Sequence, residues 1–221
     1  MISAFEALQR LRDGNQRFVA GTRKLDPAAE QNRLGDLVNG QAPIAVILGC
    51  SDSRVPVEIV FDQGLGDLFV IRVAGNIVAP SQIGSVEFAA ERFGTRLVVV
   101  LGHTRCGAVA ATLEQLQQPA ANQSQHISSI VDLIRPAVQP LLATDLRDDR
   151  DALAREAVRA NVRVSADALR HGSSVLERLI ATEGLHVVGA EYSLETGVVD
   201  IFDGATVPPL GGTAVRFRQS G

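Results

Sequence analysis

The sequence predicts an α/β fold whose core is a mainly parallel β-sheet flanked by helices. Three continuous apolar runs, residues 44–48, 68–73 and 96–101, are typical of strands buried on both faces of a parallel sheet. Segments with helical spacing of apolar residues separate and follow these runs, and strands that alternate with helices indicate an α/β sheet. The length of 221 residues, with 46% hydrophobic and 21% charged residues, fits a single globular domain over residues 1–221.

Residues 1–42 are expected to form a helical arm ahead of the core. Apolar residues recur at near-helical spacing over residues 3–19, which predicts an amphipathic helix with a break at Gly14. A polar, turn-rich stretch follows, with a short second helix around residues 30–38. Because the arm precedes the first strong strand, it must pack over the core or over a partner chain. Its apolar face favours a dimer.

The core is expected to span residues 43–202. Between the second and third strands, residues 81–93 have a helical pattern, with Ser81 as the N-cap. The later elements follow from the same patterns: helices over residues 108–118, 126–142 and 147–182, a strand over 185–192, and an edge strand or hairpin partner over 197–202. A polar linker is expected at residues 119–125, and residues 203–221 are expected to form a partly mobile tail.

Charge and composition exclude several classes of protein. The net charge of −4 gives no bulk electrostatic reason to bind nucleic acid. No apolar run approaches the roughly 20 residues of a membrane span, and the charged N-terminal segment lacks the apolar stretch of a secretory signal. Two cysteines cannot form a disulfide framework. We therefore expect a cytoplasmic protein without a nucleic-acid or membrane partner.

Chemically active residues follow two of the predicted strands. Cys50 and Asp52 come after the first strand, and His103 and Cys106 come after the third. Since the carboxyl ends of parallel strands meet at one edge of a sheet, these side chains should converge. Two thiolates and one imidazole with a further position form a tetrahedral zinc set, and an exchangeable fourth position marks a catalytic zinc. A closed structural zinc site and a coincidence of unrelated buried residues remain alternatives.

The surroundings of Cys106 also suit a metal ligand. Cys106 is expected to stand at the start of a helix, where the helix dipole lowers the pKa of a thiol. Gly102 and Gly107 flank the second cluster, so the backbone can approach a metal closely.

The segment CSDSRVP at residues 50–56, followed by GHTRCG at residues 102–107, resembles the β-class carbonic anhydrases. Residues 65–76 and 85–94 also match that family, and the looser resemblance runs from about residue 30 to about residue 202. The resemblance implies Zn²⁺ held by Cys50, His103 and Cys106. It also implies a lyase that hydrates CO₂ reversibly to bicarbonate and a proton through a zinc-bound hydroxide.

The resemblance further implies a carboxylate–guanidinium pair formed by Asp52 and Arg54. Asp52 either pairs with Arg54 or becomes a fourth zinc ligand in a closed state. The resemblance also assigns substrate contacts to Gln41 and to an apolar wall of Phe69, Ala74 and Phe88. For these apolar residues, core packing is the alternative interpretation.

The details favour the plant-like, open-type active site of this family. Gln41 stands nine residues before Cys50, as in that subtype. The other subtype has a second bicarbonate pocket made of Trp, Arg and Tyr. Arg72 and Tyr192 match two of its positions, but Ile47 stands at the position of the Trp. We therefore expect no bicarbonate switch of that kind.

The resemblance implies a homodimer or homotetramer in which the N-terminal helices embrace the partner. The main alternative is a hydrolase acting on CS₂ or COS with the same zinc scaffold. A zinc-stabilised binding module and a redox protein using the two cysteines are further alternatives, although the sequence has no C-x-x-C motif. A zinc alcohol dehydrogenase is disfavoured, because the chain is short and lacks G-x-G-x-x-G.

Overall fold

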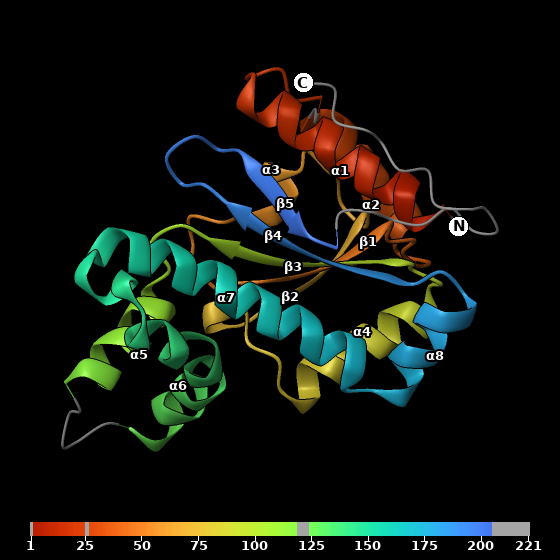
Figure 1. The fold of residues 1–221 in the computed structure, drawn as a ribbon. Coiled ribbons are helices and arrows are strands. Elements are labelled where there is room, and N and C mark those ends of the chain that lie inside the picture. Colours follow the sequence, from red (N-terminus) through yellow and green to blue (C-terminus); the bar gives the residue numbers. More distant parts are fainter. Residues whose placement is uncertain (1, 25–26, 119–123, 205–221) are drawn as a thin grey trace, which may run out of the picture.

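The computed structural model describes residues 2–24, 27–118 and 124–204. These residues contain one five-stranded sheet with the order β2-β1-β3-β4-β5 (Figure 1). The strands are β1 (Ala45–Gly49), β2 (Leu68–Arg72), β3 (Leu97–His103), β4 (His186–Tyr192) and β5 (Val199–Asp203). The first four strands are parallel and β5 is antiparallel to β4. The predicted α/β class and the edge strand are therefore confirmed.

The two central strands explain why the sequence shows unbroken apolar runs. Every residue of β1 and every residue of β3 is buried, since helices cover both faces of the sheet. The predicted third strand ended two residues too early, because Gly102 and His103 still pair with β4. Strand β3 therefore carries His103 to the carboxyl edge of the sheet with no exposed surface.

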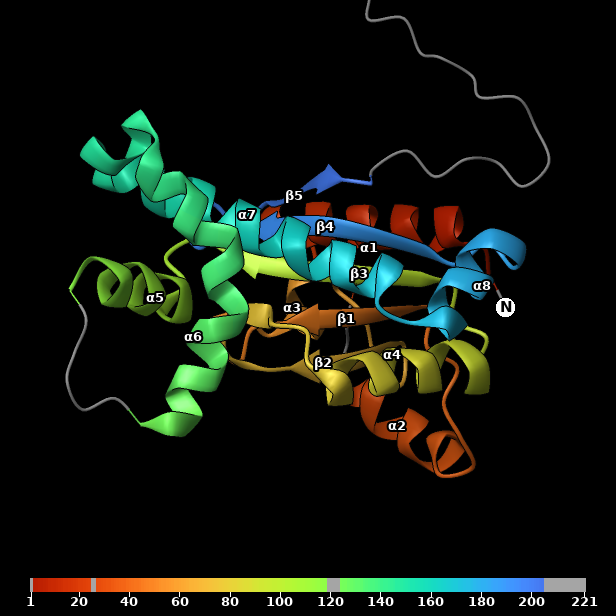
Figure 2. The ribbon, with the colours of Figure 1, turned by 60° about the horizontal axis from the view of Figure 1, so that its bottom comes forward.

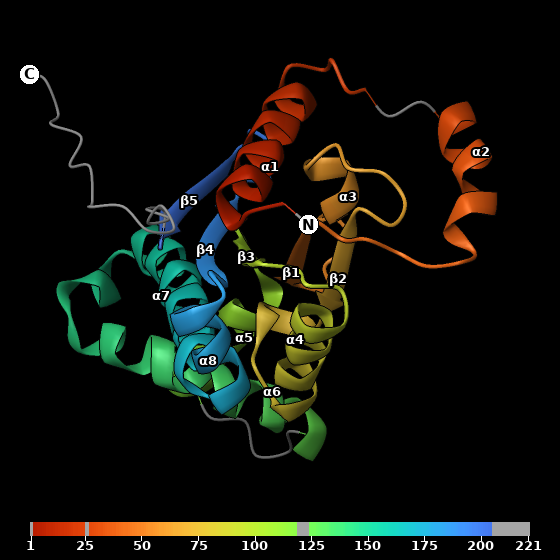
Figure 3. The ribbon, with the colours of Figure 1, turned by 90° about the vertical axis from the view of Figure 1, so that its right-hand side faces the viewer.

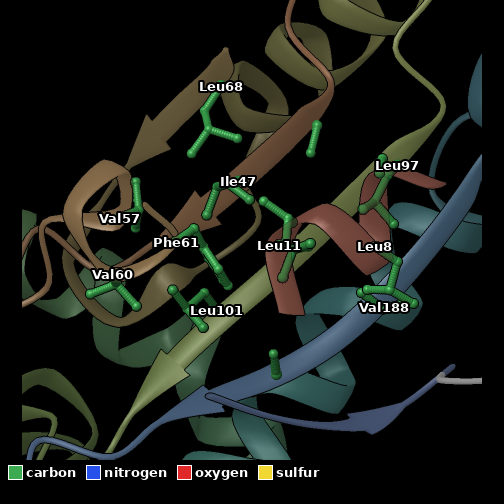
Figure 4. Close-up of a cluster of buried hydrophobic side chains, with 14 of the residues drawn as sticks. Leu8, Leu11, Ile47, Val57, Val60, Phe61, Leu68, Leu97, Leu101 and Val188 are labelled. Carbon is green, nitrogen blue, oxygen red and sulfur yellow. The ribbon is translucent and has the colours of Figure 1, made fainter. Parts of the chain in front are cut away.

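Helices α1 (Ala4–Val19) and α3 (Val57–Val60) lie on one face of the sheet. Figure 4 shows Leu8 and Leu11 of α1 packed in one cluster with side chains of β1 and β3. The predicted break at Gly14 is absent. A Cβ at Gly14 would lie 1.8 Å from the Phe61 carbonyl oxygen, so this glycine lets α1 approach α3 closely.

The structure does not confirm that the first helix packs on a dimer partner. Its apolar residues Ala7, Leu8 and Leu11 are buried against the sheet of the same chain. Helix α2 (Pro27–Leu37) lies apart from α1 (Figure 3) and is tied to the turn before β2 by an Arg33–Asp67 ion pair of 3.0 Å.

Helices α4 (Pro80–Arg92), α7 (Arg150–His171) and α8 (Ser174–Thr182) cover the other face of the sheet (Figure 1). The predicted N-cap Ser81 is wrong: Ala79 caps α4, and Pro80 begins it, because a proline needs no partner for a first-turn N–H. The pattern over residues 147–182 contains two helices rather than one. The helical pattern is interrupted at Ser173, whose side chain caps α8 by accepting a hydrogen bond from the backbone N–H of Leu176.

A third group of helices lies beyond the carboxyl ends of β1 and β3 (Figure 2). It comprises α5 (Gly107–Gln117), α6 (Gln125–Val138) and the short 3₁₀ segments η1 (Ala74–Asn76), η2 (Gln139–Ala143) and η3 (Asp145–Asp148). The predicted helix over 126–142 thus becomes 3₁₀ in its last turn. Cys50 and Cys106 share a buried cluster with Ile134 of α6 and Val158 of α7, so these helices close over the carboxyl edge.

Within the described residues, no helix combines the length and apolarity that crossing a bilayer would require. Most of the predicted linker and nearly all of the predicted tail lie outside those residues.

Candidate metal centre

The structure brings Cys50, His103 and Cys106 together at the carboxyl edge of the sheet. Cys50 follows β1, His103 ends the neighbouring β3, and Cys106 directly precedes α5. Their ligand atoms all lie within 4.8 Å of one another, and all three residues are buried. This is the convergence expected when two adjacent parallel strands end side by side.

The donor set fits a zinc ion. The Nδ1 of His103 lies 2.9 Å from the carbonyl oxygen of Thr104, so it carries the proton and donates it there. The other ring nitrogen, Nε2, is buried and has no hydrogen-bond partner among the residues that the structure describes. Zinc bonds of about 2.0–2.3 Å to nitrogen and sulfur would place tetrahedral ligands within the observed separation. An unpartnered imidazole nitrogen beside two thiols is a metal-ligating arrangement.

Cys50 and Cys106 form a hydrogen bond in which one thiol keeps its proton and the other is a thiolate. A hydrogen bond from Cys106 lowers the pKa of Cys50 to about 4, because it stabilises the Cys50 thiolate. The same bond raises the pKa of Cys106, which holds the remaining proton of the pair. Cys106 is the N-cap of α5, as predicted, and the backbone N–H groups of Ala108 and Val109 favour its thiolate. The pair therefore already holds one thiolate, on Cys50, and a cation bound there would favour loss of the remaining proton.

Asp52 lies beside this cluster and is engaged by Arg54. The guanidinium donates from Nε to Oδ1 at 2.9 Å and from Nη2 to Oδ2 at 2.7 Å, a bidentate pair. These bonds hold the pKa of Asp52 well below its usual range. The Oδ2 atom also lies 3.8 Å from Nε2 of His103. Asp52 is thus an ionised acceptor next to the unpartnered nitrogen of His103.

Ala74 is near the same cluster, whereas Gln41 is not. Ala74 begins η1, whose Gly75 donates its backbone N–H to Cys50 Sγ. Gln41 is exposed and precedes the amino end of β1, which is five residues long. At about 3.3 Å per residue, a strand of that length separates Gln41 from Cys50 by more than a side chain can span.

The aromatic residues Phe69 and Phe88 also lie away from the cluster of their own chain. Phe69 pairs with Val46 early in β2, well before the carboxyl edge. Its ring centroid is 6.2 Å from that of Phe88 in α4, and both rings contact Phe93. Phe88 is 53% exposed, so its ring remains available to another surface.

The sequence analysis did not identify how Arg72 supports the site. Arg72 donates from Nε to the carbonyl oxygen of Cys50 at 3.0 Å and from Nη2 to that of Asp52 at 2.5 Å. It therefore fixes the backbone that carries a ligand and the nearby carboxylate. The signal in the sequence was an arginine at the end of a buried strand. Tyr192, in contrast, packs with Phe18 of α1 in the cluster on the other face of the sheet.

Known proteins share this fold and these sequence features. A family model for carbonic anhydrase matches residues 45–199. Carbonic anhydrase 2 of Mycobacterium tuberculosis is 39% identical over 193 residues, covering 86% of this chain and 89% of the relative. A solved β-carbonic anhydrase of Aspergillus fumigatus superposes with a TM-score of 0.71 at 27% identity, covering 91% of this chain and 92% of the other. A tetrameric β-carbonic anhydrase of Sordaria macrospora gives a TM-score of 0.69 at 25% identity, covering 79% and 88%. The chain belongs to the β-class carbonic anhydrase family.

Proposed function

We propose that this protein is a zinc-dependent carbonic anhydrase that hydrates CO₂ reversibly to bicarbonate and a proton. Family membership supports the activity, and zinc is the cofactor of this family. The single observation that carries the assignment is the unpartnered Nε2 of His103, which lies among two thiols with Asp52 Oδ2 at 3.8 Å. A structural metal site would not need an ionised, oriented carboxylate at that position.

In this proposal, one set of residues binds the metal and another orients the groups around it. Cys50, His103 and Cys106 would hold the ion. When bound, zinc lowers the pKa of a water ligand, as in the three-histidine carbonic anhydrases, and so supplies a nucleophile at neutral pH. Arg54 keeps Asp52 ionised and donates from Nη2 to its Oδ2, which lies 3.8 Å from Nε2 of His103 and could accept a hydrogen bond from a group at the centre. While paired in this way, Asp52 would not be free to ligate a metal, which supports the open-type assignment.

Gln41, Phe69 and Phe88 can serve as substrate contacts only at the centre of a second copy. Within one chain they lie toward the amino side of the sheet, whereas the metal ligands lie at its carboxyl edge. Ala74 is near the centre of its own chain, since it precedes Gly75. We therefore propose a homodimer or homotetramer, and the Sordaria macrospora relative is a tetramer. The exposed ring of Phe88 supports such an interface.

A cytoplasmic location completes the proposal. Both cysteines are free and buried as ligands, which suits a reducing compartment.

The test is stopped-flow CO₂ hydration on metal-analysed protein near pH 7 and near pH 8.5. Rapid hydration at both pH values with about one zinc per chain is expected. Asp52→Asn should retain zinc but lose most of its turnover, because the amide presents a donor where an acceptor is needed. A fully active Asp52→Asn variant would remove the role of this carboxylate. Zinc-loaded protein without any CO₂ hydration would overturn the proposal and direct the search to CS₂ or COS.

A further inference from the structure

Two residues between the metal ligands contribute backbone carbonyls to the site. Thr104 and Arg105 connect His103 to Cys106. The Thr104 carbonyl accepts the proton of His103 Nδ1 at 2.9 Å and so orients the imidazole. The Arg105 carbonyl accepts a hydrogen bond from Nη2 of Arg54 at 3.4 Å. A shift of this loop would therefore change the orientation of the His103 imidazole and the position of Arg54, which holds Asp52.

The loop has a conformation that needs support from outside. Arg105 has a φ of 57°, in the left-handed region that residues other than glycine rarely adopt. Such a conformation persists where the surrounding structure fixes it. The side chain of Arg105 is 74% exposed, so burial does not supply this support.

Glu195, in the turn between β4 and β5, holds both loop residues with one carboxylate. Its Oε1 accepts from Nε of Arg105 at 2.6 Å, and its Oε2 accepts from Oγ1 of Thr104 at 2.7 Å. The same turn reaches Thr104 through the backbone N–H of Leu194, which donates to Oγ1 at 3.0 Å. Two charge-assisted contacts thus fix the two residues whose carbonyls enter the site.

We propose that Glu195 is a positioning residue of the metal centre, acting through Thr104 and Arg105. Glu195 fixes the Thr104 carbonyl, which orients His103, and the Arg105 carbonyl, which accepts a hydrogen bond from Arg54. Glu195 itself contacts neither the candidate ligand atoms nor the substrate. The expected effect of Glu195 on kcat rests on the proposed carbonic anhydrase activity. The expected effect on zinc release does not depend on that activity.

The experiment compares Glu195→Ala and Glu195→Gln with a matched control, Glu183→Ala. Glu183 is also a half-exposed carboxylate with two side-chain partners, in this case Arg96 and Arg178, and it lies near the amino end of β4, whereas Glu195 follows the carboxyl end of that strand. The readouts are the rate of zinc transfer to a chelator, the visible spectrum of the Co²⁺-loaded protein, and separate kcat and KM values.

Glu195→Ala is expected to raise the zinc release rate or lower kcat by about 10–100-fold, the usual effect of losing a residue that supports metal ligands. Its Co²⁺ spectrum should change, and KM should stay within about twofold of wild type. Glu195→Gln should lie between, because its amide oxygen still accepts from Thr104. The control should match wild type in spectrum and release rate.

The proposal is overturned if Glu195→Ala equals Glu183→Ala in release rate, spectrum and kcat. If the alanine variant does not fold, Glu195→Gln is judged by the same three readouts. If the wild-type protein does not hydrate CO₂, the release rates and Co²⁺ spectra still decide the role of Glu195. The two proposals therefore fail separately.

Discussion

Gly75 donates its backbone N–H to Sγ of Cys50 across 3.3 Å, and this contact links the η1 turn to the metal centre. The carbonyl of Gly75 accepts from Nδ2 of the buried Asn161 at 2.7 Å, so α7 holds the turn from the other side. Gly75 has a φ of 71°, which favours glycine. The contact stabilises the Cys50 thiolate and contributes to its lowered pKa.

Gly75→Ala should therefore weaken both folding and zinc binding. A Cβ at this position would lie 2.7 Å from Cδ1 of Ile134 and 3.1 Å from Cβ of Ala108. We expect a loss of about 1–3 kcal/mol in unfolding free energy from crowding and left-handed strain. Denaturant unfolding and chelator competition measure the two effects. Gly21→Ala is the control, since Gly21 has a φ of 69° but no atom within 4 Å of the added Cβ. Equal losses in both variants would show that crowding at Gly75 is unimportant.

Cys106→Ser should abolish stable zinc binding and activity together. A hydroxyl in place of the thiol leaves only Cys50 and His103 of the three-donor cluster, and two protein ligands are fewer than a zinc site uses. Metal analysis after dialysis against a mild chelator and stopped-flow hydration check this result. Retention of one zinc per chain by the variant would contradict the ligand assignment.

Arg54→Gln should move the acidic limb of the pH profile of kcat/KM toward higher pH. Arg54 lowers the pKa of Asp52 through its side-chain hydrogen bonds, so its removal lets Asp52 take up a proton at higher pH. The ionised acceptor is then lost earlier as the solution is acidified. Profiles of wild type and variant give the comparison. Arg135→Gln, which breaks an exposed pair with Asp132, should leave the profile unchanged. Coincident limbs for Arg54→Gln and wild type would argue against the coupling.

Glu191→Gln should stabilise the fold near neutral pH, and this advantage should shrink as the pH falls. Burial raises the pKa of Glu191, and its Oε1 has no hydrogen-bond partner in the described part of the chain. A raised folded-state pKa means that the folded protein binds this proton more tightly than the unfolded chain. The wild type therefore gains stability relative to the variant on acidification toward and below the raised pKa. We expect an advantage of about 1 kcal/mol at neutral pH, because Arg159 keeps its second partner Asp200 at 2.9 Å.

Urea unfolding of both proteins from neutral to mildly acidic pH measures that difference. A difference independent of pH would contradict the role assigned to the buried charge. A difference that grows on acidification would contradict its sign.

Arg17→Ala should destabilise the attachment of α1. Arg17 donates from Nε to Oδ2 of Asp62 at 2.5 Å, and the carboxylate of Asp62 has no exposed surface. Removing the guanidinium leaves a buried charge with the backbone N–H of Lys24 as a remaining donor. We expect a loss of about 2–3 kcal/mol in unfolding free energy. Arg135→Ala, at an exposed ion pair, should cost less than about 1 kcal/mol by the same denaturant measurement. Equal costs would mean that the Arg17–Asp62 pair behaves as a surface pair.

Local patterns were sufficient to predict the strands and the meeting of the three candidate metal donors. Continuous apolar runs identify strands buried on both faces, and β1 and β3 are buried throughout. Once these strands are parallel neighbours, the residues that follow them must meet at one edge, as Cys50 and His103 do. Two of the errors, at Ser81 and in the helix over residues 147–182, arose at helix ends, where a single proline or capping serine outweighs periodicity.

The sequence by itself therefore determined the α/β class and the convergence of Cys50, His103 and Cys106, since strand direction fixes both, and its resemblance to a known family indicated the Asp52–Arg54 pair. Only the tertiary structure showed that α1 covers its own sheet and that Gln41 lies a strand away from Cys50. It alone revealed the contact of Glu195 with Arg105, which are 90 residues apart. Such contacts depend on how distant segments pack, because a charged side chain has many partners within reach and no periodic signal selects one.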